Sequence, residues 1–299
     1  MSTQIATRIE VTPVPLAVKL GDYLQLTRPK IAVMVLITTG LGMLLAGGAL
    51  DATTVALTLI GTGLVTAGAS AGNQLIERRS DARMTRTETR PLPAGRMTGS
   101  EVLAFTMLTT ALGLACLLAL PSPAAAIVAG ASFVLYVFVY TPAKRKTWLN
   151  TFIGAVPGAL PPLIGYAGAR GVLTLETMPL FAILFFWQIP HFLAIAWIHR
   201  HDYQEARLKM LPVFDPSGRR TARAMILNTL LLIGASLWPL AFGAGYLYAF
   251  GALALGLAFL ALTWNFRGDK TIATARAVLR MSLIYLPGVL FVLFLDRMI

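Results

Sequence analysis

The chain has 299 residues, of which 57% are hydrophobic and only 13% are charged. A soluble globular domain is nearer a quarter charged, so this composition excludes an ordinary soluble enzyme and indicates a protein whose solvent is the lipid bilayer. The formal net charge of +12 is confined to short connections between apolar stretches. It therefore does not indicate a nucleic-acid-binding protein, which would need a continuous basic face. The only cysteine, Cys116, rules out an internal disulfide framework.

Residues 1–29 mix polar and apolar side chains, and we expect them to form a cytoplasmic N-terminal tail ahead of a single transmembrane domain at 30–299. They contain no apolar core that ends at a small-residue cleavage site, so we do not expect a cleaved signal peptide. The stretch from Val14 to Leu26 is weakly amphipathic. Two alternatives stay open for it, a helix on the membrane surface or a simple part of the tail.

Apolar stretches long enough to cross a bilayer, about 20 residues each, recur along the rest of the chain. Short, nearly uncharged joins such as 50–51, 120–123 and 243–246 separate several of them and are typical of tight turns. The sequence therefore predicts an all-α, polytopic membrane protein with nine transmembrane helices. We place these helices at 30–49, 52–74, 101–120, 123–141, 149–169, 178–199, 222–242, 246–265 and 279–297.

The positions of the cations predict an orientation. With nine crossings, 23 of the 25 Lys and Arg residues fall on one side of the membrane, and only Arg170 and Arg297 fall on the other. Because cytoplasmic loops carry the excess of Lys and Arg, we expect a cytoplasmic N-terminus and a C-terminus outside. Two loops on the cytoplasmic side, 75–100 and 200–221, are longer than the tight joins and rich in both charge signs. Long loops of this kind are often functional.

The first long loop begins with a stripe of oxygen-bearing side chains. Asn73, Glu77 and Asp81 recur every four residues, so they share one face if the second helix continues. One or two carboxylates together with substrate phosphates are a typical Mg²⁺ site. Arg86, Arg90 and Arg96 follow within reach of the same anion, and guanidinium groups match phosphate oxygens. The alternative is a set of surface ion pairs, which would not require an amide at the membrane end of the stripe.

Further candidates lie at or near the ends of later helices. Lys144, Arg145 and Lys146 form a basic cluster that alone would be an ordinary cytoplasmic cluster. The fifth helix, 149–169, is interrupted between 150 and 166 by two proline sites and three glycines. Broken backbone at membrane depth is tolerated where it is buried in protein or lines a cavity, so we expect this helix to line one.

Two more ionisable residues stand out, each with an open alternative. His191 lies inside the sixth helix, where an ionisable group is by default a functional candidate, although a structural imidazole bonded to a neighbouring helix is equally consistent. Asp202 is a second cytoplasmic carboxylate. It could hold another Mg²⁺, orient a basic residue, or only balance the charges around it.

These residues resemble a known family. The Asn73, Glu77, Asp81 stripe is similar to the N-x-x-x-(D/E)-x-x-x-D signature of the UbiA-type intramembrane prenyltransferases, and residues 81–92 narrow the resemblance to the haem-farnesylating members. Later blocks, at 140–145, 161–165, 190–192 and 202–213, are similar as well, so the resemblance runs from about Leu26 to the last helix. Glu77 stands where many members have Asp, and Arg207 and Lys209 replace the usual Gly and Pro.

The resemblance implies nine transmembrane helices around a central cavity and a Mg²⁺-dependent enzyme of the bacterial inner membrane. Such an enzyme transfers farnesyl from farnesyl diphosphate to a vinyl group of haem B with addition of water, which gives haem O for terminal oxidases. Besides its two substrates and membrane lipid, candidate partners are haem A synthase and oxidase assembly factors. The implied catalytic and metal-binding residues are Asn73, Glu77, Asp81 and Asp202, the diphosphate-binding residues are Arg86, Arg90, Lys144 and Arg145, and the haem-binding residue is His191.

An allylic cation could be stabilised by the ring face of Trp187, Tyr166 or Tyr140, or these aromatic residues could only pack. Two other functions stay open as alternatives. One is a related prenyltransferase that acts on a quinone or chlorophyll precursor. The other is a membrane transporter, which would require paired broken helices in two halves of the chain, whereas we find only one broken helix.

Overall fold

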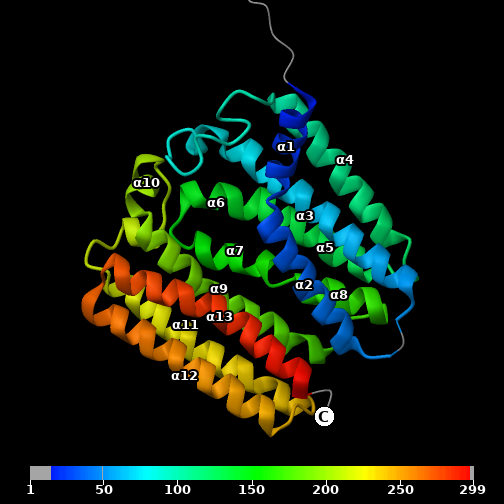
Figure 1. Cartoon of the computed structure of the whole chain (residues 1–299), viewed down its shortest axis with the longest axis vertical. Helices are drawn as coiled ribbons and strands as arrows, with labels where there is room; N and C mark the ends of the chain where they lie inside the picture. Colours follow the sequence, from blue (N-terminus) through cyan, green and yellow to red (C-terminus); the bar gives the residue numbers. More distant parts are fainter. Residues whose placement is uncertain (1–14, 49, 297–299) are drawn as a thin grey trace, which may run out of the picture.

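The computed structural model describes residues 15–48 and 50–296, and within these ranges the chain is helical and contains no strand. The described residues include nine helical segments long and apolar enough to cross a membrane, which confirms the predicted fold class and number of spans. The spans are α2 (Pro29–Ala46), α3 (Ala52–Asp81), α4 (Gly99–Leu118), α5 (Ala124–Val134) with η1 (Leu135–Tyr140) and α6 (Thr141–Lys146), α7 (Asn150–Gly158) with α8 (Pro161–Arg170), η2 (Leu175–Thr177) with α9 (Met178–Ile198), α11 (Arg219–Leu237) with η4 (Trp238–Phe242), α12 (Tyr246–Asp269) and α13 (Ile272–Asp296). Figure 1 shows their arrangement.

Several helices extend further than the hydropathy predicted. α13 begins at Ile272 instead of 279, and the additional turns carry the exposed side chain of Arg276. Arginine is a good helix former, and its charged end can remain in water, so helix formation continues where hydropathy falls. α3 likewise continues to Asp81, which is the condition under which its three polar residues share one face.

The segment before the first span forms a helix, α1 (Leu16–Thr27). One side of it packs on the bundle, where Leu26 is fully buried and Asp22 forms an ion pair with Arg96 at 2.9 Å. The other side exposes leucines such as Leu20 and Leu24. This two-sided character supports a helix at the membrane surface over an unstructured tail. Val14 and the residues before it lie outside the described part of the chain.

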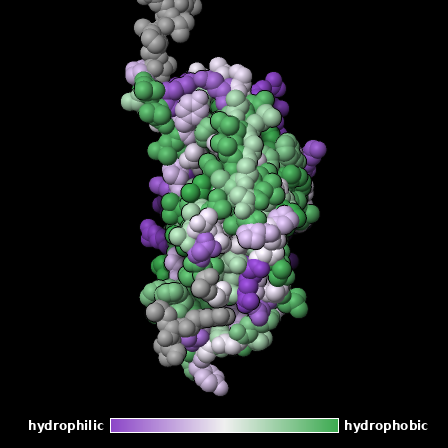
Figure 2. All heavy atoms as spheres, turned by 90° about the vertical axis from the view of Figure 1, so that its right-hand side faces the viewer, coloured by the Kyte–Doolittle hydropathy of each residue, from purple (hydrophilic) through white to green (hydrophobic). Residues whose placement is uncertain are grey.

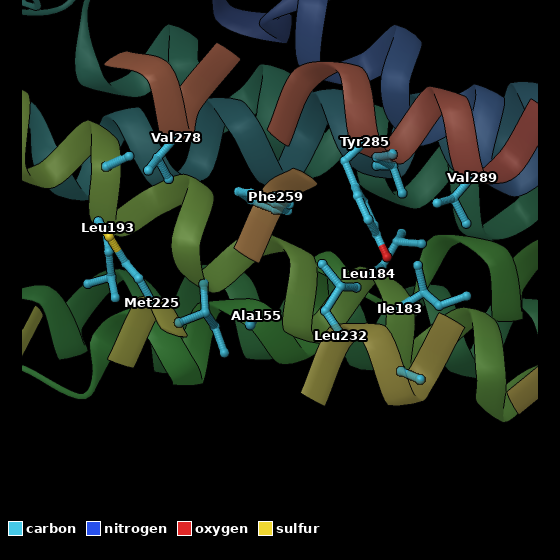
Figure 3. Close-up of a cluster of buried hydrophobic side chains, with 14 of the residues drawn as sticks. Ala155, Ile183, Leu184, Leu193, Met225, Leu232, Phe259, Val278, Tyr285 and Val289 are labelled. Atoms are coloured by element: carbon cyan, nitrogen blue, oxygen red, sulfur yellow. The ribbon is translucent and has the colours of Figure 1, made fainter. Parts of the chain in front are cut away.

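A cluster of large apolar side chains holds the second half of the chain together. Side chains from α9, α11, α12 and α13 point toward one another in the interior of this four-helix group (Figure 3). They include Ile183, Leu193, Met225, Leu232, Phe259, Val278, Tyr285 and Val289. The hydroxyl of Tyr285 is paired with Ser236 at 2.8 Å, so this polar atom in the core is satisfied.

Small residues bring the helices of the first half into close contact. Gly42 of α2 faces the backbone carbonyl of Pro162 in α8, and Gly165 of α8 faces the backbone of Thr39. A side chain at either glycine would collide with backbone rather than with a flexible side chain. Small residues at such crossings are the usual means by which membrane helices approach closely.

The two ends of the bundle differ in polarity. The loop 82–98 and the short helix α10 (Arg200–Glu205) lie where α3 and α9 finish and α11 begins, and we call this the charged end.

Hydrophobic residues dominate the face of the molecule in Figure 2, with hydrophilic residues in smaller groups. An apolar surface of this kind is expected of a protein that is surrounded by lipid.

The crossing of α2 and α8 generates a testable prediction. Gly42→Ala should lower the free energy of unfolding by about 1–3 kcal/mol, because the added methyl group must displace backbone. Gly40→Ala, two residues earlier on the same helix, is the matched control, since no atom lies within 4 Å of the point where its added methyl group would stand. It should be neutral or stabilising by up to about 1 kcal/mol. Thermal unfolding of both variants in detergent would measure this, and equal melting temperatures would contradict the packing argument.

Candidate active site

A cavity of about 1040 Å³ extends from the charged end into the membrane-spanning part of the bundle. Its polar head is lined by Arg28, Glu77, Asp81, Arg90 and Lys144. Its deeper part is lined mostly by apolar side chains from α2, α5, α8, α9 and α13. Ligand pockets usually measure about 300–1,000 Å³, so this cavity is large enough for a large ligand or for two ligands together.

The three polar residues predicted on one face of α3 are all buried. Glu77 and Asp81 line the head of this cavity, whereas Asn73 lies behind its wall and does not line it. Asn73 is 0% exposed, Glu77 6% and Asp81 1%. Each of them has a partner from another segment. The Asn73 Oδ1 accepts a hydrogen bond from Arg28 at 2.8 Å, Glu77 pairs with Lys144 at 2.7 Å, and Asp81 pairs with Arg90 at 2.7 Å. The structure thus brings the predicted acidic stripe together with two of the predicted cations.

Arg28 is a residue at this site that no sequence pattern singled out. Its guanidinium contacts Asn73 Oδ1 and the Tyr136 hydroxyl. Its backbone has φ 51°, a left-handed conformation that is unfavourable for residues other than glycine and often marks functional sites. Burial lowers the pKa of Arg28, but the attraction of Tyr136 and Glu77 outweighs it and the pKa is raised. In the sequence Arg28 is only one of the cytoplasmic cations, and no spacing links it to Asn73.

The residues at the head of the cavity include buried atoms that could bind a metal ion and an anion. Asp81 Oδ1 and Arg28 Nε are buried and have no hydrogen-bond partner among the described residues. A buried carboxylate oxygen without a partner destabilises the folded protein unless a ligand binds to it. Mg²⁺ is typically held by one or two carboxylates plus phosphates. Glu77 and Asp81 fit that description, although residues 15–48 and 50–296 contain no group of three or more His, Cys, Asp or Glu that could hold a metal by themselves.

The remaining predicted phosphate ligands divide into two groups. Arg86 lines the cavity and donates a hydrogen bond to the Tyr203 hydroxyl at 3.1 Å. Tyr203 also lines the cavity, and no sequence pattern gave it a role. Arg145 and Arg96 do not line the cavity. Arg145 donates to Ser80 at 3.2 Å, and Arg96 pairs with Asp22 at 2.9 Å, so the expectation that Arg96 reaches the same anion is wrong.

Asp202 lies on α10 and does not line the cavity. Its carboxylate is 3.6 Å from the Nδ1 of His199. Burial and the nearby Arg86 lower the pKa of His199, with Asp202 opposing them. The imidazole is therefore neutral around pH 7, and this contact does not hold Asp202 strongly. Its metal-binding role stays a prediction.

His191 lines the cavity, and its ring is fixed from two sides. Its Nδ1 is paired with the Ser282 hydroxyl at 2.8 Å, and its ring stacks on Trp187 at a centroid distance of 5.0 Å. Trp187 in turn donates to the Ser282 carbonyl at 2.7 Å. Since no described residue hydrogen-bonds Nε2, that nitrogen is the one available to a ligand.

The three aromatic candidates do not share one location. Tyr140 and Trp187 line the cavity, and the Tyr140 ring lies 4.6 Å from the Lys144 ammonium. Tyr166 does not line the cavity. Its hydroxyl instead pairs with Thr174 at 2.8 Å and with Glu176 at 3.1 Å. Sequence order could not separate them because all three lie within predicted spans.

The fifth span is broken between α7 and α8, and it lines the cavity as predicted. Because Pro161 has no N–H, the Pro157 carbonyl lacks its helical donor. It accepts hydrogen bonds from the Leu160 N–H and from the Ser132 hydroxyl, each at 3.3 Å. The freed carbonyl is thus satisfied by a local turn and by a neighbouring helix, and Pro157, Gly158 and Pro161 all contribute to the cavity wall.

Comparison with known proteins agrees with this geometry. Residues 35–284 match the UbiA prenyltransferase family. A protoheme IX farnesyltransferase from Solibacter usitatus is 42% identical, over 92% of this chain and 98% of the relative.

Two solved structures have a similar fold. A digeranylgeranylglyceryl phosphate synthase superposes with a TM-score of 0.78 at 20% identity, over 93% of this chain and 98% of that one. A UbiA homologue from Archaeoglobus fulgidus bound to GPP and Mg²⁺ superposes with a TM-score of 0.68 at 16% identity, over 93% and 100% of the two chains. The sequence match over most of its length shows that this chain belongs to the UbiA prenyltransferase family, in its protoheme IX farnesyltransferase branch.

Proposed function

We propose that the protein transfers farnesyl from farnesyl diphosphate to a vinyl group of haem B with addition of water, and so makes haem O for terminal oxidases. The observation that carries this proposal is the buried stripe of Asn73, Glu77 and Asp81 beside three cations, with the two carboxylates lining the head of a large, mostly apolar cavity. Opposed charges at one end and an apolar chamber beyond suit an amphiphilic prenyl diphosphate. The similar relative from Solibacter usitatus bears the name of this activity.

The head of the cavity would bind the diphosphate. An allylic diphosphate ionises only if the charge of the leaving group is stabilised. Arg86, Arg90 and Lys144 line the cavity and would contact the phosphate oxygens, with Arg145 less directly placed. Glu77 and Asp81, with Asn73 and Asp202, would hold Mg²⁺, which when bound supplies further positive charge to the leaving group. The Mg²⁺-bound structure of the Archaeoglobus fulgidus homologue supports this assignment.

The apolar part of the cavity would hold the farnesyl chain and exclude water from the cation. The C1–O bond breaks with its electron pair on the diphosphate, and the vinyl π electrons of haem B then form the new bond to C1. Water adds to the carbon left electron-deficient beside the porphyrin and loses one proton. Tyr140 and Trp187 line the cavity and could stabilise the first cation through their ring faces.

His191 would hold haem B by one axial bond from Nε2 to the iron. Its Nδ1 contact with Ser282 fixes the ring orientation, as is usual for metal-bound imidazoles. An axial bond would hold the macrocycle while leaving its vinyl edge free to react. A quinone or chlorophyll precursor as acceptor has less support, because the Solibacter usitatus relative is named for protoheme. A transporter has less support because the chain belongs to a family of transferases.

The protein is a multi-pass membrane protein, and we place it in the bacterial inner membrane with the charged end in the cytoplasm. The N-terminus would then be cytoplasmic and the C-terminus outside. Haem A synthase and oxidase assembly factors are candidate partners because they would receive the product.

The first prediction from this function concerns the acidic stripe. Purified protein incubated with haem B, farnesyl diphosphate and Mg²⁺ should yield haem O by mass spectrometry, and Asp81→Asn should lose this activity while remaining folded. Glu77→Asp should retain measurable activity because it keeps the carboxylate. Glu88→Gln, an exposed acid on the same loop, is the control and should be near wild type. Full turnover of Asp81→Asn, or of wild type with excess chelator, would remove the stripe as a metal site.

A second prediction tests His191. If it binds haem iron, His191→Ala should weaken haem binding and shift the Soret band, while the affinity for farnesyl diphosphate stays nearly unchanged. Ser282→Ala, which keeps the imidazole but removes its hydrogen bond, should have a smaller effect. If His191 is structural, the variant should instead lose about 1–3 kcal/mol of stability with the haem spectrum intact. That result would exclude the ligand role.

A third prediction tests the orientation. Reporter fusions after Gly95 and after Gly218 should report the cytoplasm, and a fusion after Ile299 should report the opposite side, because 23 of 25 cations lie on one side. A cytoplasmic signal from the C-terminal fusion would mean that the direction of the last span is wrong.

A further inference from the structure

A second group of cations gathers at the charged end, away from the cavity. Arg219 and Arg223 lie one turn apart at the start of α11, and Arg267 and Lys270 lie at the end of α12. Together they line a separate pocket of about 290 Å³. None of the four lines the large cavity, so the proposed reaction does not explain why they converge.

No carboxylate neutralises this pocket. The described residues include no ion pair to any of its four cations. The neighbouring Asp269 accepts a hydrogen bond from Thr271, and Asp215 is occupied by the backbone and hydroxyl of Thr221. Four positive charges that share a pocket with no carboxylate paired to any of them repel one another, and an anion bound between them would relieve that repulsion.

The backbone arrangement also favours an anion here. α11 begins at Arg219 and has no acidic residue in its first turn, although the Asp215 carboxylate just before it accepts a hydrogen bond from the Thr221 N–H. Arg219 and Arg223 still lie near the positive end of the helix dipole, an arrangement that a bound anion would stabilise. Lys270 adopts φ 44°, a left-handed conformation. Its carbonyl accepts a hydrogen bond from Trp197 Nε1 at 3.1 Å, which fixes the backbone of the fourth cation in place.

The surroundings of the pocket identify the kind of anion. Below the cations, α11 and α12 expose apolar side chains, among them Leu227 at 57%, Leu231 at 43% and Leu257 at 53%. The exposed Trp264 lies beneath the guanidinium of Arg267 at 4.7 Å, as aromatic residues do at the level of lipid headgroups. A free phosphate would use the cations but not this adjoining apolar surface.

We propose that this pocket binds the phosphate headgroup of one anionic phospholipid, whose acyl chains lie along α11 and α12. Basic pockets between membrane helices are known to hold such headgroups. Trp197 belongs to α9 and donates a hydrogen bond to the Lys270 carbonyl. The bound lipid would therefore also stabilise the position of α9, the helix that leads to α10. The proposal does not depend on the identity of the substrates.

The test is a lipid titration of delipidated, purified protein followed by native mass spectrometry. Wild type should retain one phosphatidylglycerol at least about tenfold more tightly than phosphatidylcholine. The triple variant R219Q/R223Q/R267Q should weaken phosphatidylglycerol binding by at least about tenfold, since each cation near an anionic lipid headgroup contributes to its binding. The control R220Q/R276Q/R280Q removes the same charge from exposed positions outside the pocket and should change binding less than about twofold.

Three results would overturn the proposal. The first is an equal loss of phosphatidylglycerol binding in the two triple variants, which would indicate diffuse charge attraction. The second is equal retention of phosphatidylglycerol and phosphatidylcholine by wild type. The third is displacement of the lipid by inorganic phosphate at equal concentration, which would indicate a site for a free anion. If the triple variant does not fold, the single variant Arg223→Gln serves instead. It alters one exposed side chain and should still weaken phosphatidylglycerol selectively.

Discussion

Two carboxylates on α3 are buried inside a membrane protein, and the rest of the structure is arranged around the cations that pair with them. Glu77 and Asp81 are 6% and 1% exposed, and an unpaired carboxylate at such a position would be strongly destabilising. Breaking a buried pair by removing one partner typically costs about 3–5 kcal/mol. Lys144 on α6 and Arg90 in the loop 82–98 satisfy them. These pairs therefore fix the position of the fourth span and of the long loop relative to α3.

The same pairs suggest how the site prepares for its substrate. In the structure the acids and two of the cations neutralise one another. A metal ion on the acids would replace the cations as counter-charge, and the cations could then turn to phosphate oxygens. The head of the cavity thus contains both charge signs without a large uncompensated charge in either state. Asn73, held between Arg28 and Thr141, joins α3 to the start of α2 and to α6 behind this polar region.

Beyond this polar region the fold must keep a large cavity open while remaining stable. The apolar cluster of α9, α11, α12 and α13 provides one rigid wall. The opposite wall depends on close backbone contacts, as between Gly42 and Pro162. The break between α7 and α8 lies in the cavity wall, and its freed carbonyl is satisfied by Ser132. Packing is therefore tight around the cavity, and the irregular backbone of this span is confined to its lining.

The sequence alone determined the nine spans, the break in the fifth span and the shared face of Asn73, Glu77 and Asp81, because these follow from local hydropathy, proline chemistry and helical periodicity. It also placed Arg86, Arg90, Lys144 and His191 among the candidates, and all four line the cavity. Only the tertiary structure could decide the partners. Arg28 meets Asn73 across 45 positions in the chain, His191 meets Ser282 across 91, and Tyr166 and Arg145 turn out not to line the cavity. Such contacts depend on how helices distant in the sequence pack against one another, and no local pattern in the chain encodes that packing.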